Sequence, residues 1–313
     1  MLRREDNLLV SIIVITYNSA KYVLETLESA KVQTYQNIEL IVSDDCSMDD
    51  TVEICKQWIE ANKERFVRVE LITVPENTGI PGNCNRGVNI AQGEWVKLIA
   101  GDDLLFSSCI EKNMKEVDEN STILLSEVID FIDKKELNLF KSPVCSNINP
   151  MFKNLKSAHF QFLYFLKGFY IPGSAIFIRR NKLIEVGGYD EKYTLVEDRP
   201  LFLKFTYNDL LIKCIIPVTI AHRIHSTSIT ANYGSKVIPQ YVIQVWEVIH
   251  LYASFYHKRQ FKINALWHLH IISIITSFGN KGVVCNFLNR FRITFQPLRF
   301  YNLLTKLKIV NPN

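Results

Sequence analysis

The sequence predicts an α/β fold built on an open, mostly parallel sheet with helices on both of its faces. Residues 9–16 (LVSIIVIT) form a continuous apolar, β-branched run, which is typical of a strand buried on both faces. Further strand patterns at 38–43, 67–74 and 94–100 alternate with helical patterns, as in a β-α-β-α-β unit. With 313 residues, 48% hydrophobic and 22% charged, the chain can bury one large core or two smaller ones.

Apolar spacing and capping residues place the helices between these strands. Apolar side chains recur at helical spacing over 20–30, with Asn18 or Ser19 as the expected N-cap. The stretch 75–87 (PENTGIPGNCNRG) is rich in turn-forming residues, so only a short helix is expected there, over 85–91. The first connection is therefore predicted as a regular helix and the third mostly as a loop.

Beyond residue 103 the pattern is less regular. An irregular stretch around 141–156 interrupts it, and helices rich in aromatic residues follow residue 237. Between residues 103 and 237 we expect two strands at 123–130 and 175–179, a helix at 198–207, and a closing strand pair or an extended segment at 211–223. This half is expected to complete the sheet and to end in a helical extension.

Charge is distributed unevenly along the chain. Residues 226–313 contain ten Lys or Arg and one acid, Glu247, a net charge of +9, so residues 1–225 carry −5 of the chain's total of +4. A basic segment suggests an anionic partner, either membrane phospholipid or nucleic acid. Its apolar content favours the membrane, and because no nucleic-acid recognition motif is present we expect no nucleic-acid partner.

Residues 263–280 contain no Lys, Arg, Asp or Glu, but two His, two Asn and several hydroxyl groups dilute their apolar character. A spanning helix usually needs about 20 mainly apolar residues. Cationic and aromatic clusters flank this segment, at Lys258-Arg259, Arg290-Phe291-Arg292 and Arg299-Phe300-Tyr301. The pattern favours helices that lie on an anionic membrane surface, and helices that only pack on the rest of the protein are the alternative.

The cysteines and the N-terminus indicate the compartment. Seven cysteines are spread along the chain without a CxxC pair, which fits a reducing cytoplasm better than a zinc or redox site. The apolar run at the N-terminus ends at Asn18 without a small-residue cleavage site, so we interpret it as a strand and not as a signal peptide. With the basic tail, these features predict a cytoplasmic protein associated peripherally with the inner face of the cytoplasmic membrane.

Polar side chains follow three of the predicted strands at their carboxyl ends, where ligands bind in open parallel sheets. They are Thr16, Tyr17 and Asn18 after the first strand, Asp44 and Asp45 after the second, and Asp102 and Asp103 after the fourth. Helix capping could explain any one of these groups alone. Three polar loops at one edge predict a nucleotide-sized site.

Asp102 and Asp103 follow the buried strand WVKLIAG directly. Adjacent carboxylates repel each other unless a cation lies between them, so a solvated turn and a metal site are the two interpretations. A hard divalent ion held by carboxylate and diphosphate oxygens would relieve the repulsion. The same ion would stabilise a diphosphate leaving group.

Two later motifs contain further candidate residues. Gly187-Gly188 predicts a tight turn, and Asp198 then stands at the start of a predicted helix, as an N-cap or as a general base. In the segment His222-Arg223-Ile224-His225, a neutral imidazole could complete a metal shell that a carboxylate begins.

Together these segments resemble the family-2 glycosyltransferases of the GT-A fold over roughly residues 9–230. The matching segments are VSIIVITYN, NIELIVSDDCSMDDT, ENTG…NRG…AQGEW, KLIAGDD, VGGYDEKY…VEDRPLFLKF and HRIHSTS. The resemblance implies a Rossmann-like, parallel-centred mixed sheet in a catalytic domain at 1–230. Its nucleotide-sugar half is expected at 1–103 and its acceptor and base half at 104–230. The remaining 231–313 form the basic, aromatic-rich helical tail.

The resemblance also implies roles for single residues. The nucleotide sugar is expected to contact Thr16, Tyr17, Asn18, Asp44, Asp45, Asn85 and Asp102. The metal is expected to be held by Asp103, Asp102 and His225, and Asp198 is the expected catalytic base. Where many members carry Ala-Arg-Asn-x-Gly, this chain has Asn-Cys-Asn-Arg-Gly at 83–87, so the usual arginine is absent.

The function implied is inverting transfer of a hexose or N-acetylhexosamine from a UDP-sugar to a glycan acceptor. A lipid-linked acceptor of bacterial surface polysaccharide (O-antigen or capsule) is expected, with a divalent metal, Mn²⁺ rather than Mg²⁺. One alternative is a catalytically silent nucleotide-sugar-binding module, against which both acidic pairs argue. A dinucleotide-dependent oxidoreductase is a second alternative, but no GxGxxG follows the first strand.

Overall fold

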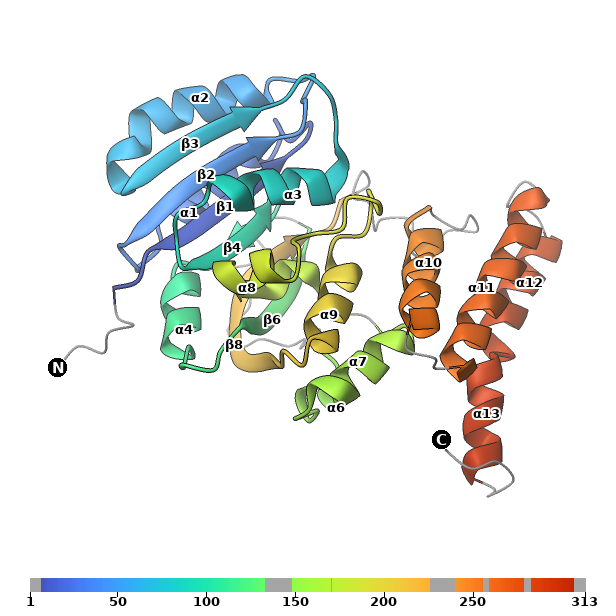
Figure 1. Cartoon of the computed structure of the whole chain (residues 1–313). Coiled ribbons are helices and arrows are strands. Elements are labelled where there is room, and N and C mark those ends of the chain that lie inside the picture. The colour runs from blue at the N-terminus through green and yellow to red at the C-terminus, as the bar shows by residue number, and fades with distance from the viewer. Residues whose placement is uncertain are drawn as a thin grey trace. The chain divides into compact units, whose positions relative to one another are not determined.

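The computed structural model describes residues 7–132, 148–169, 171–225, 240–255, 259–278 and 283–306 (Figure 1). The chain divides into two compact units. The first comprises Met1–Gln161 and Ile171–His225, and the second comprises Phe162–Tyr170 and Ser226–Asn313. The helix α7 (Ala158–Leu166) therefore begins in the first unit and ends in the second.

The first unit is built on an eight-stranded mixed sheet with the order β3-β2-β1-β4-β7-β6-β8-β5. Its strands are β1 (Val10–Thr16), β2 (Ile38–Asp44), β3 (Arg68–Thr73), β4 (Trp95–Ala100), β5 (Leu104–Leu105), β6 (Ile123–Phe131), β7 (Ile176–Arg179) and β8 (Ile212–Arg223). The first four strands pair in parallel, β7 is antiparallel to both its neighbours, β6 and β8 are parallel, and β5 is antiparallel to β8. The predicted parallel-centred mixed sheet is confirmed.

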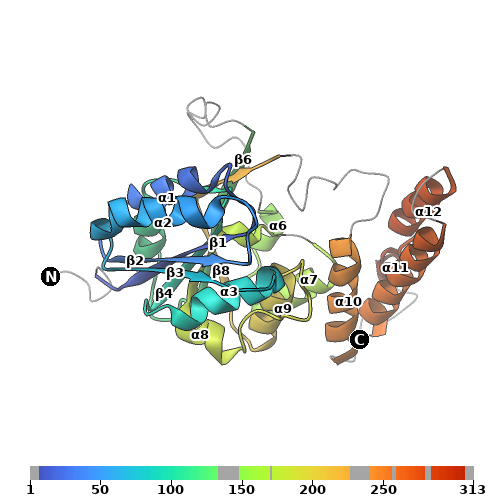
Figure 2. The ribbon, with the colours of Figure 1, turned by 90° about the horizontal axis from the view of Figure 1, so that it is seen from above.

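Helices cover both faces of this sheet. They are α1 (Val23–Lys31), α2 (Thr51–Asn62), α3 (Gly79–Ile90), α4 (Cys109–Lys115), α6 (Pro150–Lys153), α8 (Arg180–Glu185) and α9 (Asp198–Tyr207). Figure 2 shows α1 and α2 on one face and α3, α8 and α9 on the other. Because both faces are covered, β1 and β2 are buried along almost their whole length, and nine of their fourteen residues are apolar.

The expected caps of the first helix are wrong. Helix α1 begins at Val23, and neither candidate side chain bonds to its amide groups. The Asn18 Oδ1 atom accepts the Met48 N–H instead, and the Ser19 hydroxyl accepts the Tyr17 N–H. The reason is tertiary, because the left-handed backbone of Asn18 (φ 50°) directs its amide to the loop after β2.

Helix α3 is longer than predicted, since it begins at Gly79 inside the stretch expected to be mostly loop. The first amide groups of a helix need acceptors from outside the helix. Asp45, from the end of β2, accepts the N–H groups of Thr78 and Gly79 at 2.9–3.0 Å. Pro81 falls in the first turn, where no N–H is required. A side chain at Gly87 would overlap Ile13, so the glycine permits close packing on β1.

A buried lysine connects two parts of the sheet. Lys97 of β4 is fully buried, and its Nζ donates to the backbone carbonyls of Ser174 and Ile176 at 2.5 and 3.0 Å. Burial lowers the pKa of this lysine to about 8. The contact fixes the 3₁₀ turn Gly173–Ala175 before β7 against the strand that ends at Asp102 and Asp103.

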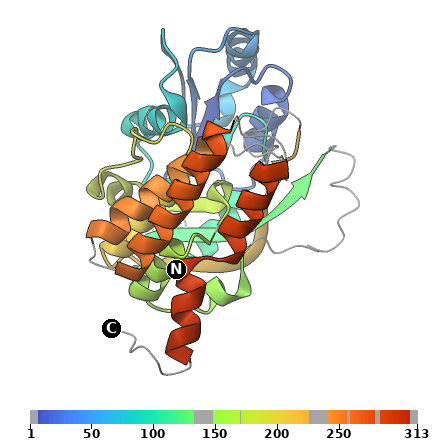
Figure 3. The same cartoon turned by 90° about the vertical axis from the view of Figure 1, so that its right-hand side faces the viewer.

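The second unit contains the helices α10 (Gln240–Phe255), α11 (Arg259–Ser277), α12 (Val283–Thr294) and α13 (Pro297–Lys306). Helix α11 packs against the other three (Figure 3). The core of this unit contains the imidazole of His268 from α11, which stacks on Trp246 of α10 with 3.6 Å between ring centroids. Burial and the nearby Arg292 lower the pKa of His268 to about 3, so this ring is neutral. Among the described helices, none combines the length and the apolar character that crossing a bilayer requires.

Candidate active site

The loops after β1 and β2 meet at the carboxyl edge of the sheet, as their spacing predicts. The Thr16 hydroxyl donates to Asp44 Oδ2 at 2.7 Å, and the Ser47 N–H and hydroxyl donate to the same carboxylate at 2.9 and 2.6 Å. Ser47 also accepts the Asn18 N–H at 2.8 Å. The aromatic ring of Tyr17 stands beside this network with 51% of its surface exposed.

The Asp45 carboxylate forms all of its hydrogen bonds within the protein. Besides the two amide groups at the start of α3, its carboxylate accepts the Thr78 hydroxyl at 2.7 Å and pairs with Arg86 at 3.0 Å. A carboxylate has about four acceptor positions, so this one is saturated. Arg86 therefore supports the loop after β2, a role that the family motif without its usual arginine did not indicate.

The loop after β4 joins the other two. The Gly101 N–H donates to the Ile15 carbonyl at 2.9 Å, and a Cβ atom at Gly101 would lie 2.9 Å from Thr16 Cγ2. Only glycine permits this approach. The turn that carries Asp102 and Asp103 is consequently held against the end of β1.

Asp102 and Asp103 face different partners. Asp102 Oδ2 lies 2.9 Å from His225 Nε2, and this carboxylate is partly exposed. Asp103 is buried, and its Oδ1 accepts the Arg223 N–H at 2.9 Å. Burial, together with the charge of Asp102, raises the pKa of the Asp103 carboxyl. A positive charge at this turn would oppose both effects.

Arg223 holds the acidic turn in place, although sequence reasoning did not select it. Its Nε donates to the Asp102 carbonyl at 2.8 Å, and its guanidinium pairs with Glu25 at 3.1 Å. The guanidinium lies 4.5 Å from the ring centroids of both Tyr22 and Phe131. The sequence feature that could have identified Arg223 is its position between two candidate histidines at the end of a strand beside the site.

His222, within β8, and His225, two residues beyond the strand, have different partners, as extended backbone requires. His222 Nδ1 contacts Asp130 Oδ1 at 2.9 Å, on the neighbouring strand β6, whereas His225 reaches Asp102. Burial lowers the pKa of His222, but the hydrogen bond to Asp130 and the charges of Asp103 and Asp130 outweigh it and raise the pKa to about 9. His225 is therefore the histidine in contact with the acidic turn.

The described residues contain no group of three or more His, Cys, Asp and Glu side chains close enough to enclose a metal ion. Asp102 and His225 supply two donors already in contact, and Asp103 is turned to the Arg223 N–H. Hard divalent ions are often bound by one or two carboxylates, with substrate phosphates and water as the other ligands. These residues fit such a site, completed by a substrate.

Glu197 and Asp198 stand at the start of α9, where both are half-buried. Asp198 is the first helical residue, and its Oδ1 accepts the Arg199 N–H at 2.6 Å, so it does not act as the N-cap. A Cβ atom at Gly173 would lie 3.0 Å from Asp198 Cβ and 3.3 Å from Glu197 Oε1. Burial raises the pKa of both carboxyl groups, that of Glu197 to about 8 with help from the charge of Asp198.

The shifted pKa of Glu197 predicts how stability depends on pH. Glu197 binds its proton more tightly in the folded state than in the unfolded state, where its pKa is about 4.3. Its contribution to the free energy of unfolding is therefore complete below about pH 4 and is lost as the pH rises through 8. Glu197→Gln cannot ionise, so its Tm should exceed that of the wild type at pH 8.5 by more than at pH 5. Equal differences in Tm at the two pH values would contradict the assignment.

Asn85 lies on α3, and its amide binds the chain between β7 and α9. Its Nδ2 donates to the Tyr189 carbonyl at 2.9 Å and to Glu191 Oε1 at 2.7 Å, and its Oδ1 accepts the Tyr189 N–H at 2.8 Å. This arrangement differs from the expectation that Asn85 contacts the nucleotide sugar, because both amide hydrogens already have acceptors.

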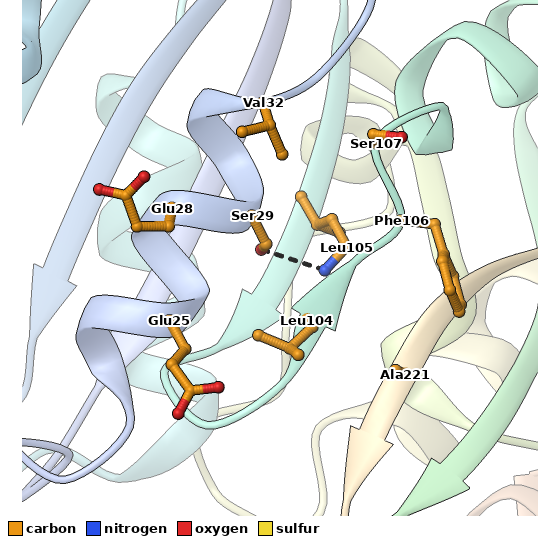
Figure 4. A pocket seen from close by; sticks show the side chains of 9 residues that line it. All are labelled: Glu25, Glu28, Ser29, Val32, Leu104, Leu105, Phe106, Ser107 and Ala221. Atoms are coloured by element: carbon orange, nitrogen blue, oxygen red, sulfur yellow. Dashed lines mark hydrogen bonds between the residues drawn. The ribbon is translucent and has the colours of Figure 1, made fainter. Parts of the chain in front are cut away.

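A pocket of about 260 Å³ lies between α1 and β5 (Figure 4). Leu104, Leu105 and Phe106 line one side of it, and Glu25 and Glu28 of α1 line the other. None of the predicted nucleotide, metal or base residues borders it. It is a mainly apolar recess, and the three polar loops do not line it.

The sheet and its acidic loops define a glycosyltransferase of the GT-A fold. Residues 11–187 match the family described as "Glycosyl transferase family 2". This chain belongs to that family, and the resemblance drawn from its motifs is confirmed.

Named relatives agree with this assignment. The chain is 34% identical to "Glycosyltransferase GlyG" of Streptococcus pneumoniae serotype 4 over 111 residues, 36% of this chain and 36% of GlyG. It is 28% identical over 235 residues to "UDP-Glc:alpha-D-GlcNAc-diphosphoundecaprenol beta-1,3-glucosyltransferase WfaP" of Escherichia coli, 74% of this chain and 84% of WfaP. The match thus spans about a third of GlyG but most of WfaP.

Solved structures share the fold. S. aureus TarS 1–349 in complex with UDP superposes with a TM-score of 0.61 at 20% identity, covering 88% of this chain and 75% of that chain. The mannosyltransferase PcManGT of Pyrobaculum calidifontis, solved with GDP-Man and Mn²⁺, gives 0.57 at 15% identity, covering 95% and 84%. At these identities the likeness concerns the fold alone.

Proposed function

We propose that this enzyme moves a hexose or N-acetylhexosamine from a UDP-sugar to a hydroxyl group of a lipid-linked glycan in surface polysaccharide biosynthesis, with inversion. The observation that carries the proposal is the meeting of three polar loops, after β1, β2 and β4, at the carboxyl edge of the parallel strands. The name of WfaP specifies a UDP-glucose donor and a diphosphoundecaprenol-linked acceptor, which supports this choice of substrates.

Of the residues expected from the sequence, Tyr17, Asp44 and Asp102 face the donor. The exposed Tyr17 ring stacks on uracil, and Asp44, which accepts three protein hydrogen bonds, has capacity for one more. Asp45 acts indirectly, because its saturated carboxylate shapes the loop rather than reaching the ligand. Thr16 and Asn18 likewise position the loop, and Asp102 faces the diphosphate.

The reaction is a single in-line displacement. Asp198 takes the proton from the acceptor hydroxyl, whose oxygen forms a bond to the anomeric carbon of the sugar. The bond from that carbon to the diphosphate oxygen breaks on the opposite face, so the configuration inverts and UDP leaves. Burial favours this role, because it raises the pKa of Asp198 toward that of an effective general base.

Asp102, Asp103 and His225 would hold the divalent metal. When bound, the metal neutralises the charge that develops on the diphosphate leaving group. The raised pKa of Asp103 and the contact between Asp102 and His225 support a turn that binds a cation. Mn²⁺ is favoured over Mg²⁺ by the family resemblance and by the ion in PcManGT.

The second unit binds the anionic inner surface of the membrane through an aromatic face formed by α12, by Phe295 just beyond its end and by Trp267 of α11. Phe291 lies 6.3 Å from Phe287, 4.9 Å from Phe295 and 5.5 Å from Trp267 between ring centroids. Phe287 and Phe295 are 64% and 62% exposed, and Arg290 is exposed on the same helix. Aromatic rings and cations together are typical of helices at a membrane interface. The net charge of +9 over residues 226–313 supports anionic lipid as the partner.

The double variant Phe287→Ser/Phe295→Ser is expected to bind vesicles containing anionic lipid at least about tenfold more weakly, because each phenylalanine contributes about 1.5–3 kcal/mol when buried. Co-sedimentation at low and high salt measures the loss. Ile216→Ser is the matched control, since Ile216 is 89% exposed on β8 in the first unit. Equal binding by all three proteins, or binding to neutral vesicles only, would refute the surface.

A catalytically silent nucleotide-sugar-binding module is the competing function. Nucleotide release from a panel of UDP- and GDP-sugars, with and without Mn²⁺ and a lipid-linked acceptor, separates the two. Metal-dependent release of UDP from one donor, with a β-linked product from an α-linked sugar, is expected. Binding of a UDP-sugar without release under any condition would favour the silent module, and release from GDP-sugars alone would contradict the donor class.

A further inference from the structure

Helix α3 is attached to the sheet at both of its ends. At its N-terminus, Asp45 accepts the amide groups of Thr78 and Gly79. At its C-terminus, Arg68 of β3 donates to the Ile90 carbonyl at 3.2 Å. The helix is thus fixed relative to the strands that form the donor site.

Asn85, in the middle of α3, holds the chain that leads to Asp198. Its amide forms a matched pair of hydrogen bonds with the backbone N–H and carbonyl of Tyr189, as a neighbouring strand would. A Cβ atom at Gly188 would lie 2.7 Å from Asn85 Oδ1. Gly188 also has a φ of +64°, so the Gly-Gly turn is shaped to receive this amide.

Two more contacts hold the segment from Gly188 to Glu197. The Ile80 N–H, at the start of α3, donates to the Thr194 carbonyl at 3.1 Å. Lys204 of α9 donates to the Gly188 carbonyl at 2.9 Å. The segment is therefore held between α3 and α9, and it ends at the carboxyl groups of Glu197 and Asp198.

We propose that Asn85 is a positioning residue that sets the place of the Asp198 carboxyl through the Gly188–Glu191 turn, and that it contacts neither donor nor acceptor. The proposal rests on the proposed function, in which Asp198 is the base. Because Asp45 holds the N-terminus of the same helix, α3 links the donor loops to the segment that leads to Asp198. An arginine at position 84, as in many relatives, is not needed for this link.

Asn85→Ala is expected to lower kcat by about 10- to 100-fold, because a displacement of about 1 Å at a reacting group can cost that much. The KM for the donor and the affinity for UDP should stay within about twofold. Hydrogen exchange at the Tyr189 amide should become faster. Asn89→Ala is the matched control, since Asn89 is exposed on the same helix, and it should leave all four quantities unchanged.

Asn85→Asp tests the geometry with less risk to folding. It keeps the acceptor for the Tyr189 N–H but loses both donated hydrogen bonds and places a charge beside Glu191. Adding Glu191→Gln removes that repulsion and returns one donor, so kcat of the double variant should exceed that of Asn85→Asp alone. A residue that contributed only to stability would show a change in Tm without this recovery of kcat.

Three outcomes would overturn the role of Asn85. A higher donor KM with unchanged kcat in Asn85→Ala would make Asn85 a donor contact. A lower Tm with unchanged kcat would make it a purely structural residue. Unchanged exchange at Tyr189 would show that the amide pair does not hold the turn. Failure of the proposed function is recognised separately, as wild-type turnover that persists in Asp198→Asn.

Discussion

Asp198→Asn is expected to lower kcat by about 10³-fold, within the 10²- to 10⁴-fold range of general-base catalysis. Asparagine has the same shape and its Oδ1 still accepts the Arg199 N–H, but it cannot take a proton. The fold should therefore be retained, with a Tm equal to or above that of the wild type, because a half-buried charge is removed. UDP release in the presence of acceptor measures the loss.

The pH profile gives the same carboxyl a second test. As the proposed base, Asp198 must be ionised to act, and burial raises its pKa. The acid limb of kcat/KM should thus lie above the value of about 4 that an ordinary aspartate shows, with a tenfold loss per pH unit below it. Asp209→Asn is the matched control, an exposed aspartate just beyond the other end of α9. Turnover within a few-fold of wild type in Asp198→Asn would place the base elsewhere.

Asp103→Asn is expected to abolish metal dependence and to lower kcat/KM at least about 100-fold, since a metal contributes several kcal/mol of charge stabilisation. In the metal-free protein, by contrast, the substitution should not lower the stability. Asparagine still accepts the Arg223 N–H and relieves the repulsion between two adjacent carboxylates, one of them buried. The variant should therefore be at least as stable as the wild type without metal.

Thermal unfolding with increasing Mn²⁺ separates these effects. A ligand that binds only the folded state raises Tm with concentration. The wild type should show that rise, and adding EDTA should reverse it. Asp103→Asn should show little or none, with Asp209→Asn behaving as wild type. An equal rise in all three proteins would mean that the metal binds away from the acidic turn.

Local pattern was enough for all strands of the sheet except the two-residue β5. A continuous apolar run identified β1 within a residue, because a strand buried on both faces leaves no alternation to misread, and the strand pattern at 38–43 identified β2 equally well. The helix at 198–207 was predicted with its observed bounds. The carboxyl ends of parallel strands coincide, so the meeting of the three polar loops followed from the order of the elements.

Predictions failed where a distant residue decides a local structure. Helix α3 was underestimated because its first amide groups are satisfied by Asp45, from another strand. Asn18 was expected to cap a helix, but its amide bonds to Met48 across the loop. In both cases a hydrogen bond from elsewhere in the chain overrides the local propensity.

By itself the sequence determined the family, the mixed sheet and the list of acidic residues at its carboxyl edge, since these depend on residue type and order along the chain. Only the tertiary structure decided what each side chain faces. In the folded protein Asp103 accepts the Arg223 N–H, and the Asp45 carboxylate is fully hydrogen-bonded by groups at and near the start of α3. Asn85 accepts the Tyr189 N–H in the turn before Asp198. The physical reason is that a hydrogen bond requires two groups within about 3 Å, and for residues far apart in sequence only packing sets that distance.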